Sequence, residues 1–343
     1  MIVTAPGIRF RFQPEGGFLT DLVISDHGRL IAPLYRAPWL AETLPADMPT
    51  HLRFLQGDFF CAPFCGHSDG SDFHGWPANG TWQVGDSRPG TVAADLPQSV
   101  KGARISKLLE VDAGHPWVYQ THRLTGGTGQ LPVANHAMVA LPNGGLIRTS
   151  PKAFWETSPL PQETDAARGR SALAYPARTA DPRAFPRADG SVADLTRYPW
   201  TDRAEDFCAG VEAPGSALGW TAITRPAEGD LYLSLRNPAK LPMTMLWHSN
   251  YGRDYLPWSG RNRCLGVEEG AASMMLGLSA DQANPGSLSL NPAGTVDVRH
   301  VIGAIGWPSG EAVAEILATG DLIQVRGEGG ARRSLPFRGG FLS

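Results

Sequence analysis

Charged residues are scarce in this sequence, and neither sign of charge forms a block. Lys, Arg, Asp and Glu make up 18% of the 343 residues, below the usual fraction of about 25%, and the formal net charge is −3. A nucleic-acid-binding surface needs clustered Lys and Arg, and the chain has no such cluster. We therefore expect no nucleic-acid partner.

Long apolar runs and abundant cysteine are also lacking. No run of about 18 apolar residues is present, so we expect no membrane partner. The N-terminal MIVTAPGIRFRF has no charged segment followed by an apolar one, so we expect no signal peptide and a cytoplasmic location. Cys61, Cys65, Cys208 and Cys264 do not have zinc-site spacing, and we expect reduced, packed thiols.

Glycine and proline, by contrast, are frequent. The chain holds 40 Gly and 29 Pro, which disfavours long helices and favours many short strands joined by turns. Ile8–Pro14 and Leu19–Ser25 read as a first hairpin, and Leu131–Leu141 as a strand that carries His136. Residues 158–215 show little periodicity and read as an irregular excursion, a length that is often functional.

The C-terminal segment has a different pattern. Ser309 precedes the run from Glu311 to Leu317, and Gly320 follows it. Ser as an N-cap, Glu near the start and Gly at the end predict a short helix there. Leu322–Val325 and Ser334–Phe337 predict a final hairpin.

The stretch Leu55–Trp82 contains the strongest functional signal. Phe59–Phe64 is a short aromatic run between glycines and predicts a buried strand. After a polar loop come His74, Gly75, Trp76 and Pro77, which set a titratable ring beside an aromatic and a restricted backbone. This is typical of a small-molecule pocket.

The chain resembles the aldose 1-epimerase, or galactose mutarotase-like, superfamily, and in particular its hexose-6-phosphate epimerase-like branch. The motifs that carry the resemblance occur in the family order over roughly residues 20–300. They are Gln56-Gly57-Asp58 with Ala62-Pro63-Phe64-Cys65-Gly66, His74-Gly75-Trp76 with Trp82, Asn135-His136, Leu246-Trp247-His248-Ser249-Asn250, and Val267-Glu268-Glu269.

The resemblance implies an all-β supersandwich of large antiparallel sheets over residues 1–305. Residues 306–343 would be an extension packed on the same domain. The implied function is the interconversion of the α and β anomers of a hexose or related sugar by acid/base ring opening. That reaction needs no cofactor, and its partner is a small-molecule sugar. We expect a monomer or homodimer.

The resemblance also implies roles for individual residues. Glu268 stands at the position of the catalytic base, His136 at that of the acid, and His74 at that of the substrate-holding His. Glu269 stands where the family has Pro, which leaves the register open by one residue. The implied substrate-binding set is Gln56, Trp76, Asn135 and Asp202, with Asp206 and Asp254 as rivals of Asp202.

Two departures from the branch bear on the substrate. Gln56 and Ala78 stand where the branch carries Arg. Since Arg is the usual bidentate phosphate ligand, we expect a neutral sugar, or an unusual uronic or branched one, rather than a sugar phosphate.

Four alternatives stay open at the level of sequence. The fold could serve carbohydrate binding without catalysis. Glu268 and Glu269 could form an exposed turn before Gly270. His67, Asp69, Asp72 and His74 offer nitrogen and oxygen ligands for a metal ion, in a spacing that matches no established motif. Arg253 and Trp258 could contact a sugar or pack the rim.

Overall fold

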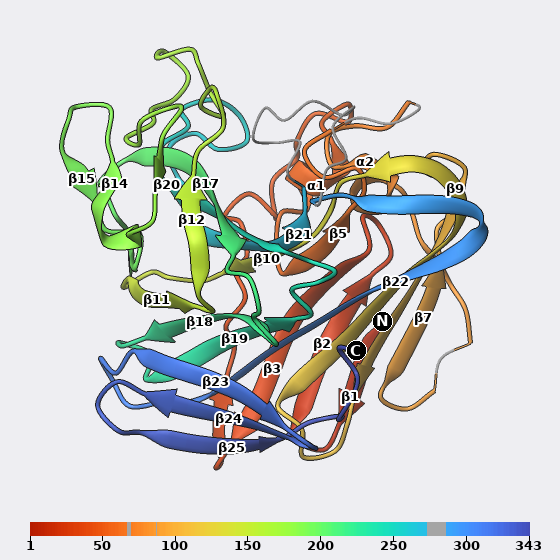
Figure 1. Ribbon diagram of the computed structural model, residues 1–343. Coiled ribbons are helices and arrows are strands. Elements are labelled where there is room, and N and C mark those ends of the chain that lie inside the picture. Colours follow the sequence, from red (N-terminus) through yellow and green to blue (C-terminus); the bar gives the residue numbers. More distant parts are fainter. Residues whose placement is uncertain (67–69, 87, 273–285) are drawn as a thin grey trace.

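Two large antiparallel sheets lie face to face, and a small third sheet packs against the second of them (Figure 1). The computed structural model describes residues 1–66, 70–86, 88–272 and 286–343. Within these ranges the only helices are α1 (Thr50–Arg53), α2 (Gly75–Asn79) and the 3₁₀ turn η1 (Pro182–Ala184). The predicted all-β class is therefore confirmed.

The first sheet has eleven strands in the described part of the chain. In order across the sheet they are β1 (Ile2–Ala5), β2 (Ile8–Gln13), β3 (Phe18–Asp26), β5 (Asp58–Cys61), β10 (Val133–Val139), β21 (Arg263–Ala271), β20 (Met243–Asn250), β17 (Ala204–Glu212), β12 (Lys152–Glu156) and β13 (Arg178–Thr179), with β4 (Arg29–Ile31) paired to β3. The pairing of β2 with β3 confirms the predicted first hairpin.

The second sheet has nine strands within the same ranges. In order they are β16 (Arg197–Tyr198), β11 (Gly145–Thr149), β18 (Gly219–Arg225), β19 (Asp230–Arg236), β22 (Leu288–Gly306), β9 (Trp117–Leu131), β8 (Ala103–Val111), β7 (Thr91–Asp95) and β6 (Gln83–Val84). A separate two-stranded sheet joins β14 (Phe185–Pro186) to β15 (Val192–Ala193).

Two strands from the C-terminal part of the chain each join the two parts of one large sheet. β21 lies between β10 and β20, and so joins the N-terminal half of the first sheet to the strands that follow in the sequence. β22 lies between β19 and β9 and makes the same connection in the second sheet. Both sheets are thus completed by strands from the last quarter of the chain.

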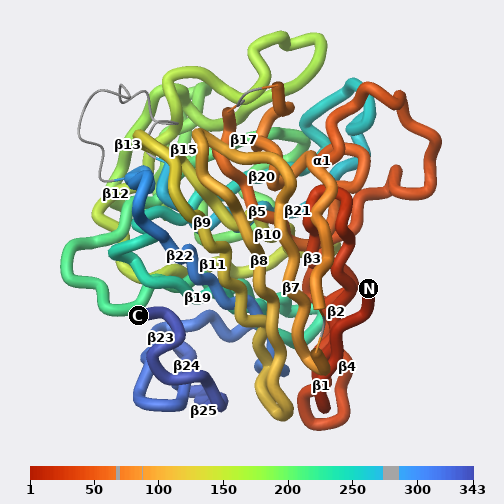
Figure 2. The backbone as a smooth tube through the Cα atoms, turned by 90° about the vertical axis from the view of Figure 1, so that its right-hand side faces the viewer, coloured from red at the N-terminus to blue at the C-terminus, as the bar shows by residue number. Residues whose placement is uncertain are grey.

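The C-terminal extension is a three-stranded sheet made of β23 (Val313–Thr319), β24 (Leu322–Gly327) and β25 (Arg332–Pro336). Its inward side chains, among them Ile316, Ile323 and Val325, pack on the outer face of the second sheet. Figure 2 shows the backbone of the three strands at one end of the molecule, near β19 and β22. That face is apolar as well, so β18 and β19 are buried along their whole length. The extension therefore adds a third layer to the sandwich.

The predicted helix after Ser309 is wrong, because these residues form β23. Thr319 pairs with Leu322, so Gly320 (φ +58°) opens a two-residue hairpin loop rather than ending a helix. The Glu311 carboxylate accepts the backbone N–H groups of Gly329 (3.1 Å) and Ala331 (2.7 Å) in the next turn of the sheet. Gly320 and Glu311, which suggested the end and the start of a helix, have other roles in the hairpin. Gly320 lies in its loop, and Glu311 accepts hydrogen bonds from the backbone.

The interpretation of residues 158–215 as one irregular excursion is wrong from residue 204 onward. There the chain forms β17, a nine-residue strand that pairs with β20 and β12. Its side chains are buried on both faces apart from Val211, and its sequence mixes Ala, Gly and Cys with acidic residues. A strand of this kind lacks the alternation by which strands are recognised. Residues 158–203 keep the predicted character, with two-residue strands only.

Candidate active site

A pocket of about 350 Å³ lies on the outer face of the first sheet, away from the second sheet. Five neighbouring strands each supply one side chain to its floor, namely Phe59 (β5), His136 (β10), Glu268 (β21), Trp247 (β20) and Phe207 (β17). The register pairs His136 with both Phe59 and Glu268, which puts all three side chains on one face. The walls come from α1, from Cys65, Phe73 and His74, and from residues 253–258.

The centre of the floor is a His–Glu pair. The Nε2 atom of His136 lies 3.1 Å from Oε1 of Glu268, and the side chains are 6% and 2% exposed. The His136 ring stacks on Phe59 at 4.6 Å between centroids and meets the edge of Trp247 at 5.9 Å. These aromatic neighbours fix the plane of the imidazole and exclude water from the pair.

Burial keeps both members of the pair electrically neutral. Desolvation raises the pKa of Glu268 well above its usual value, and the carboxyl group therefore favours its protonated form. Desolvation, followed by repulsion from His51, lowers the pKa of His136 to about 3. Both shifts favour the neutral form of the pair, with the shared proton on the carboxyl group.

His74 reaches the same pocket from the loop before α2. It has a left-handed backbone (φ +73°), and the next residue, Gly75, has φ +74°. A Cβ at Gly75 would lie 2.0 Å from the carbonyl oxygen of Ala62, so only glycine fits against the end of β5. The His74 ring meets the His136 ring edge-on at 5.5 Å, and Nδ1 of His74 accepts the Cys65 N–H at 3.3 Å.

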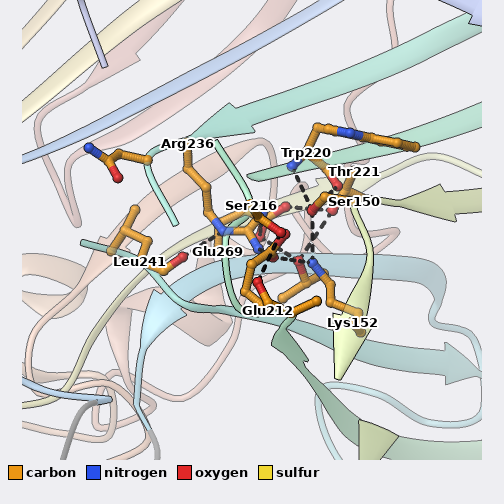
Figure 3. Close-up of polar contacts among 12 residues, drawn as sticks. Ser150, Lys152, Glu212, Ser216, Trp220, Thr221, Arg236, Leu241 and Glu269 are labelled. Atoms are coloured by element: carbon orange, nitrogen blue, oxygen red, sulfur yellow. Dashed lines mark hydrogen bonds and ion pairs between the residues drawn. The ribbon is translucent and has the colours of Figure 1, made fainter. Parts of the chain in front are cut away.

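The structure settles the register that the sequence left open. Glu268 and Glu269 are consecutive residues of β21, so their side chains point to opposite faces of the sheet. The Glu269 carboxylate lies between the sheets, where it contacts Nη1 of Arg236 at 2.7 Å and accepts hydrogen bonds from Thr221 (2.6 Å) and Thr244 (2.8 Å) (Figure 3). Both carboxylates are buried, which excludes the exposed-turn alternative.

Glu269 belongs to a chain of polar contacts that crosses the interior between the sheets. Part of this chain is drawn in Figure 3. Its links are Lys152–Glu212 (2.6 Å), Glu212–Arg236 (2.6 Å), Arg236–Glu269 (2.7 Å), Glu269–Ser234 (3.2 Å), Ser234–His300 (2.8 Å), His300–Gln120 (3.3 Å) and Gln120–Asp58 (2.6 Å). Two cations and two carboxylates pair at its Lys152 end, so the buried charges compensate one another.

An ion pair between Glu205 and Arg253 borders the pocket; the sequence indicated Arg253 as a possible sugar contact but not Glu205. Glu205 of β17 is 1% exposed and accepts hydrogen bonds from the Trp247 indole and from Ser249 (2.9 Å). Nη1 of Arg253 lies 3.5 Å from Oε1 of Glu205, and its guanidinium lies over the Trp258 ring at 4.8 Å. Arg253 and Trp258 line the pocket. Glu205 sits next to Asp206, and no sequence pattern distinguishes the two.

The predicted substrate-binding residues do not line this pocket. Gln56 is buried and donates from Nε2 to Gln13 at 3.2 Å. Asn135 pairs in register with Phe60 and Glu269, which places it on the face toward the second sheet. Trp76 of α2 packs against the core between the sheets, and Asp202 is exposed.

The two rivals of Asp202 have other contacts. Asp206 is fully buried and accepts the backbone N–H groups of Ala172 (3.0 Å) and Leu173 (3.1 Å), so it ties the excursion to β17. Asp254 forms ion pairs with Arg170 (3.0 Å) and Arg203 (2.8 Å). Neither is among the residues that line the pocket.

The metal-binding alternative is only partly open to inspection. His67 and Asp69 lie outside the described residues, whereas Asp72 and His74 lie within them. Among the residues that the structure describes, no group of three or more His, Cys, Asp or Glu is placed to hold a metal ion. No helix in these ranges is long and apolar enough to cross a membrane.

Comparison with known proteins places the fold. No protein-family model and no curated protein sequence matches the chain. Among solved structures, an aldose 1-epimerase candidate from Escherichia coli K12 aligns with a TM-score of 0.58 and 14% identity over 88% of this chain and 97% of its own. The fold is that of the galactose mutarotase-like proteins. A galactose mutarotase-related enzyme from Lactobacillus acidophilus aligns with a TM-score of 0.54 and 10% identity over 90% and 98% of the two chains.

A third structure agrees with these two. An aldose 1-epimerase candidate from Klebsiella pneumoniae aligns with a TM-score of 0.50 and 13% identity over 88% of this chain and 78% of its own. The galactose mutarotase-like fold that the motifs indicated is therefore confirmed by three structures at low identity.

Proposed function

We propose that the protein is an aldose 1-epimerase-like isomerase that interconverts the anomers of a sugar. The observation that carries the proposal is the contact between His136 Nε2 and Glu268 Oε1, 3.1 Å long, at the floor of an aromatic-lined pocket. The pocket volume of about 350 Å³ falls in the range of small-molecule sites. The aromatic rings offer the apolar surfaces on which the C–H faces of a pyranose pack.

The reaction needs a base and an acid on one pyranose. Glu268 takes the proton of the anomeric hydroxyl, the C1–O5 bond breaks as C1=O forms, and His136 gives a proton to O5. The C1–C2 bond then rotates. Closure reverses both transfers, so Glu268 returns its proton to O1 and His136 recovers its own. Each turnover therefore restores the starting protonation without any cofactor.

The buried pair suits this cycle because it holds a single mobile proton. Burial favours that proton on Glu268, because it disfavours the charged form of each partner. The hydroxyl groups of a bound sugar supply the missing solvation, and the 3.1 Å contact lets the proton pass to His136. His74 faces His136 edge-on and is placed to hold the sugar beside the ring oxygen.

The test is the rate of anomer exchange, measured by polarimetry on fresh α-sugars and by exchange spectroscopy of the anomeric protons. We expect Glu268→Gln and His136→Asn each to lower kcat by about 10²–10⁴-fold, the usual contribution of an acid/base group. Glu315→Gln, an exposed carboxylate on the third sheet, serves as the matched control and should keep full activity. Unchanged exchange in Glu268→Gln would refute the assignment of the base.

The same protein variants test the alternative that the protein binds a carbohydrate without catalysing a reaction. A protein that accelerates no sugar but binds one in titration calorimetry would be a carbohydrate-binding protein of this fold. Binding that survives in Glu268→Gln while exchange is lost supports the enzyme, because the variant changes chemistry and leaves the aromatic walls in place.

A further inference from the structure

Arg253 is the only Lys or Arg side chain among the residues that line the described pocket. It is 14% exposed, and its Nε is buried without a hydrogen-bond partner. Its contact with Glu205, at 3.5 Å, is an ion pair too long for a strong hydrogen bond. In the described part of the chain, the guanidinium donates no hydrogen bond at all. A guanidinium has five N–H donors, so this one keeps most of its bonding capacity unused.

Both carboxylate oxygens of Glu205 accept hydrogen bonds from groups other than Arg253. Oε1 accepts from the Trp247 indole and Oε2 from the Ser249 hydroxyl at 2.9 Å, both within the wall of the pocket. Burial raises the pKa of Glu205, which weakens it as a counter-ion for Arg253. The Arg253 side chain is held in place instead by the face of Trp258 at 4.8 Å. A second carboxylate, Glu163, also attracts Arg253, but it is already paired with Arg168 at 3.1 Å. The Arg253 cation is thus positioned by packing and has no strong hydrogen-bonded counter-ion among the described residues.

We propose that Arg253 recognises a carboxylate on the sugar, so that the preferred substrate is a hexuronic acid rather than a neutral hexose. A planar carboxylate matches the fork of one guanidinium. A phosphate dianion normally gathers more than one cation, and the other residues that line the pocket in the described ranges include no Lys or Arg. The inference rests on the proposed epimerase function and names the substrate class of that same pocket.

The first measurement compares anomer exchange of galacturonic and glucuronic acids with that of galactose and glucose. We expect the unaltered protein to have a higher kcat/KM for the uronic acids. Arg253→Gln should lower kcat/KM for the uronic acids by about ten- to a hundred-fold, mainly through KM, the range expected for a hydrogen bond to a charged group. For the neutral sugars it should change by less than about threefold.

Two further variants separate recognition from general damage. Arg253→Lys keeps the charge and loses the fork, so it should retain part of the preference for uronic acids. Arg104→Gln removes a charge from an exposed position on β8, in the second sheet, and should change neither rate. Melting curves confirm that each variant is folded. An equal loss on acidic and neutral sugars in Arg253→Gln would overturn the proposal, as would a native preference for neutral sugars.

Failure of the epimerase function is distinguishable from failure of this inference. Exchange of neutral sugars with no gain for uronic acids keeps the enzyme and overturns the carboxylate subsite. With no exchange on any sugar, titration calorimetry with galacturonate decides. Binding that the unaltered protein shows and Arg253→Gln lacks supports the subsite, and absence of binding to the unaltered protein overturns it.

Discussion

At the scale of single residues, the sequence indicated His74, His136, Glu268 and Arg253 as site candidates but did not indicate Glu205. His74, His136 and Glu268 lie in motifs with distinctive neighbours, and the structure gathers all three in one pocket. Glu205 and Arg253 lie in segments without a recognisable pattern, and their pairing depends on how β17 meets the loop after β20. Contacts between segments that are distant in sequence are fixed by tertiary packing, which residue patterns do not encode.

Replacing one or the other of the adjacent carboxylates Glu268 and Glu269 should change the stability of the protein in opposite directions. Among the described residues Glu268 pairs with His136 and with no Lys or Arg, and burial raises its pKa on folding. Such a group binds more protons in the folded state, so it lowers stability as pH rises above the usual value near 4.5. Glu268→Gln should therefore raise the melting temperature by a few degrees at pH 8 and leave it nearly unchanged at pH 4. The measurement is thermal unfolding by circular dichroism across this range.

The matched change at the next position should do the reverse. Glu269 pairs with Arg236 in the interior, and Glu269→Gln leaves one buried cation uncompensated. Breaking one partner of a buried pair costs about 3–5 kcal/mol, so we expect clear destabilisation at neutral pH. Urea unfolding of both variants checks the pair. Destabilisation of equal size in Glu268→Gln and Glu269→Gln would contradict the assignment of the two faces of β21.

At the scale of secondary-structure elements, strands with alternating or aromatic patterns were predictable and strands buried on both faces were not. The hairpin of β2 and β3 follows directly from its alternation. β17 was not predicted because its positions on both faces are buried, and because acidic residues such as Glu205 and Asp206 are typical of loops. β23 was not predicted because a glycine can either end a helix or open a hairpin. Only the pairing with β24 distinguishes the two structures.

The excursion of residues 158–203 offers a test of how an irregular element is held. The Asp206 carboxylate accepts backbone N–H groups from Ala172 and Leu173 and the hydroxyl of Tyr175 (3.3 Å). Asp206→Asn replaces one acceptor oxygen by a donor that faces these N–H groups. We expect amide exchange in residues 170–176 to accelerate by about tenfold or more, a loss of roughly 1.4 kcal/mol in local stability.

Hydrogen-exchange mass spectrometry makes this measurement. Asp202→Asn, in the exposed turn just before β17, is the control and should leave these amides unchanged. Because Gln162 of the excursion lines the pocket, Asp206→Asn should also raise KM for the sugar more than it lowers kcat. Unchanged protection of residues 170–176 would contradict the role of Asp206 as the tether.

At the scale of the whole molecule, the motif order indicated the sandwich but not its third layer or its interior polar chain. Lys152, Glu212, Arg236 and Glu269 carry charges that sequence statistics place at the surface. Their burial is tolerated because each charge meets an opposite one between the sheets. Mutual compensation of this kind is invisible until the strands that carry the residues are aligned.

The third layer yields a prediction about solubility. Val325 points from β24 into the apolar cluster that covers the second sheet, whereas its neighbour Gln324 is only partly buried. Val325→Asp places an unpaired charge in that cluster and should destabilise the protein by about 3 kcal/mol or more, with binding of a hydrophobic dye and aggregation. Gln324→Asp should have little effect. Dye fluorescence and light scattering during heating distinguish the two variants.

The late position of β21 and β22 has a consequence for how the protein is made. A chain leaving the ribosome contains the flanking strands of both sheets long before the two strands that join them. Until residue 271 has emerged, β10 and β20 each have an unpaired edge, and until residue 306 has emerged so do β19 and β9; such edges favour pairing with other chains. Each sheet can therefore be completed only after β21 or β22 has been made, and a chain stalled before them would be a substrate for chaperones and proteases.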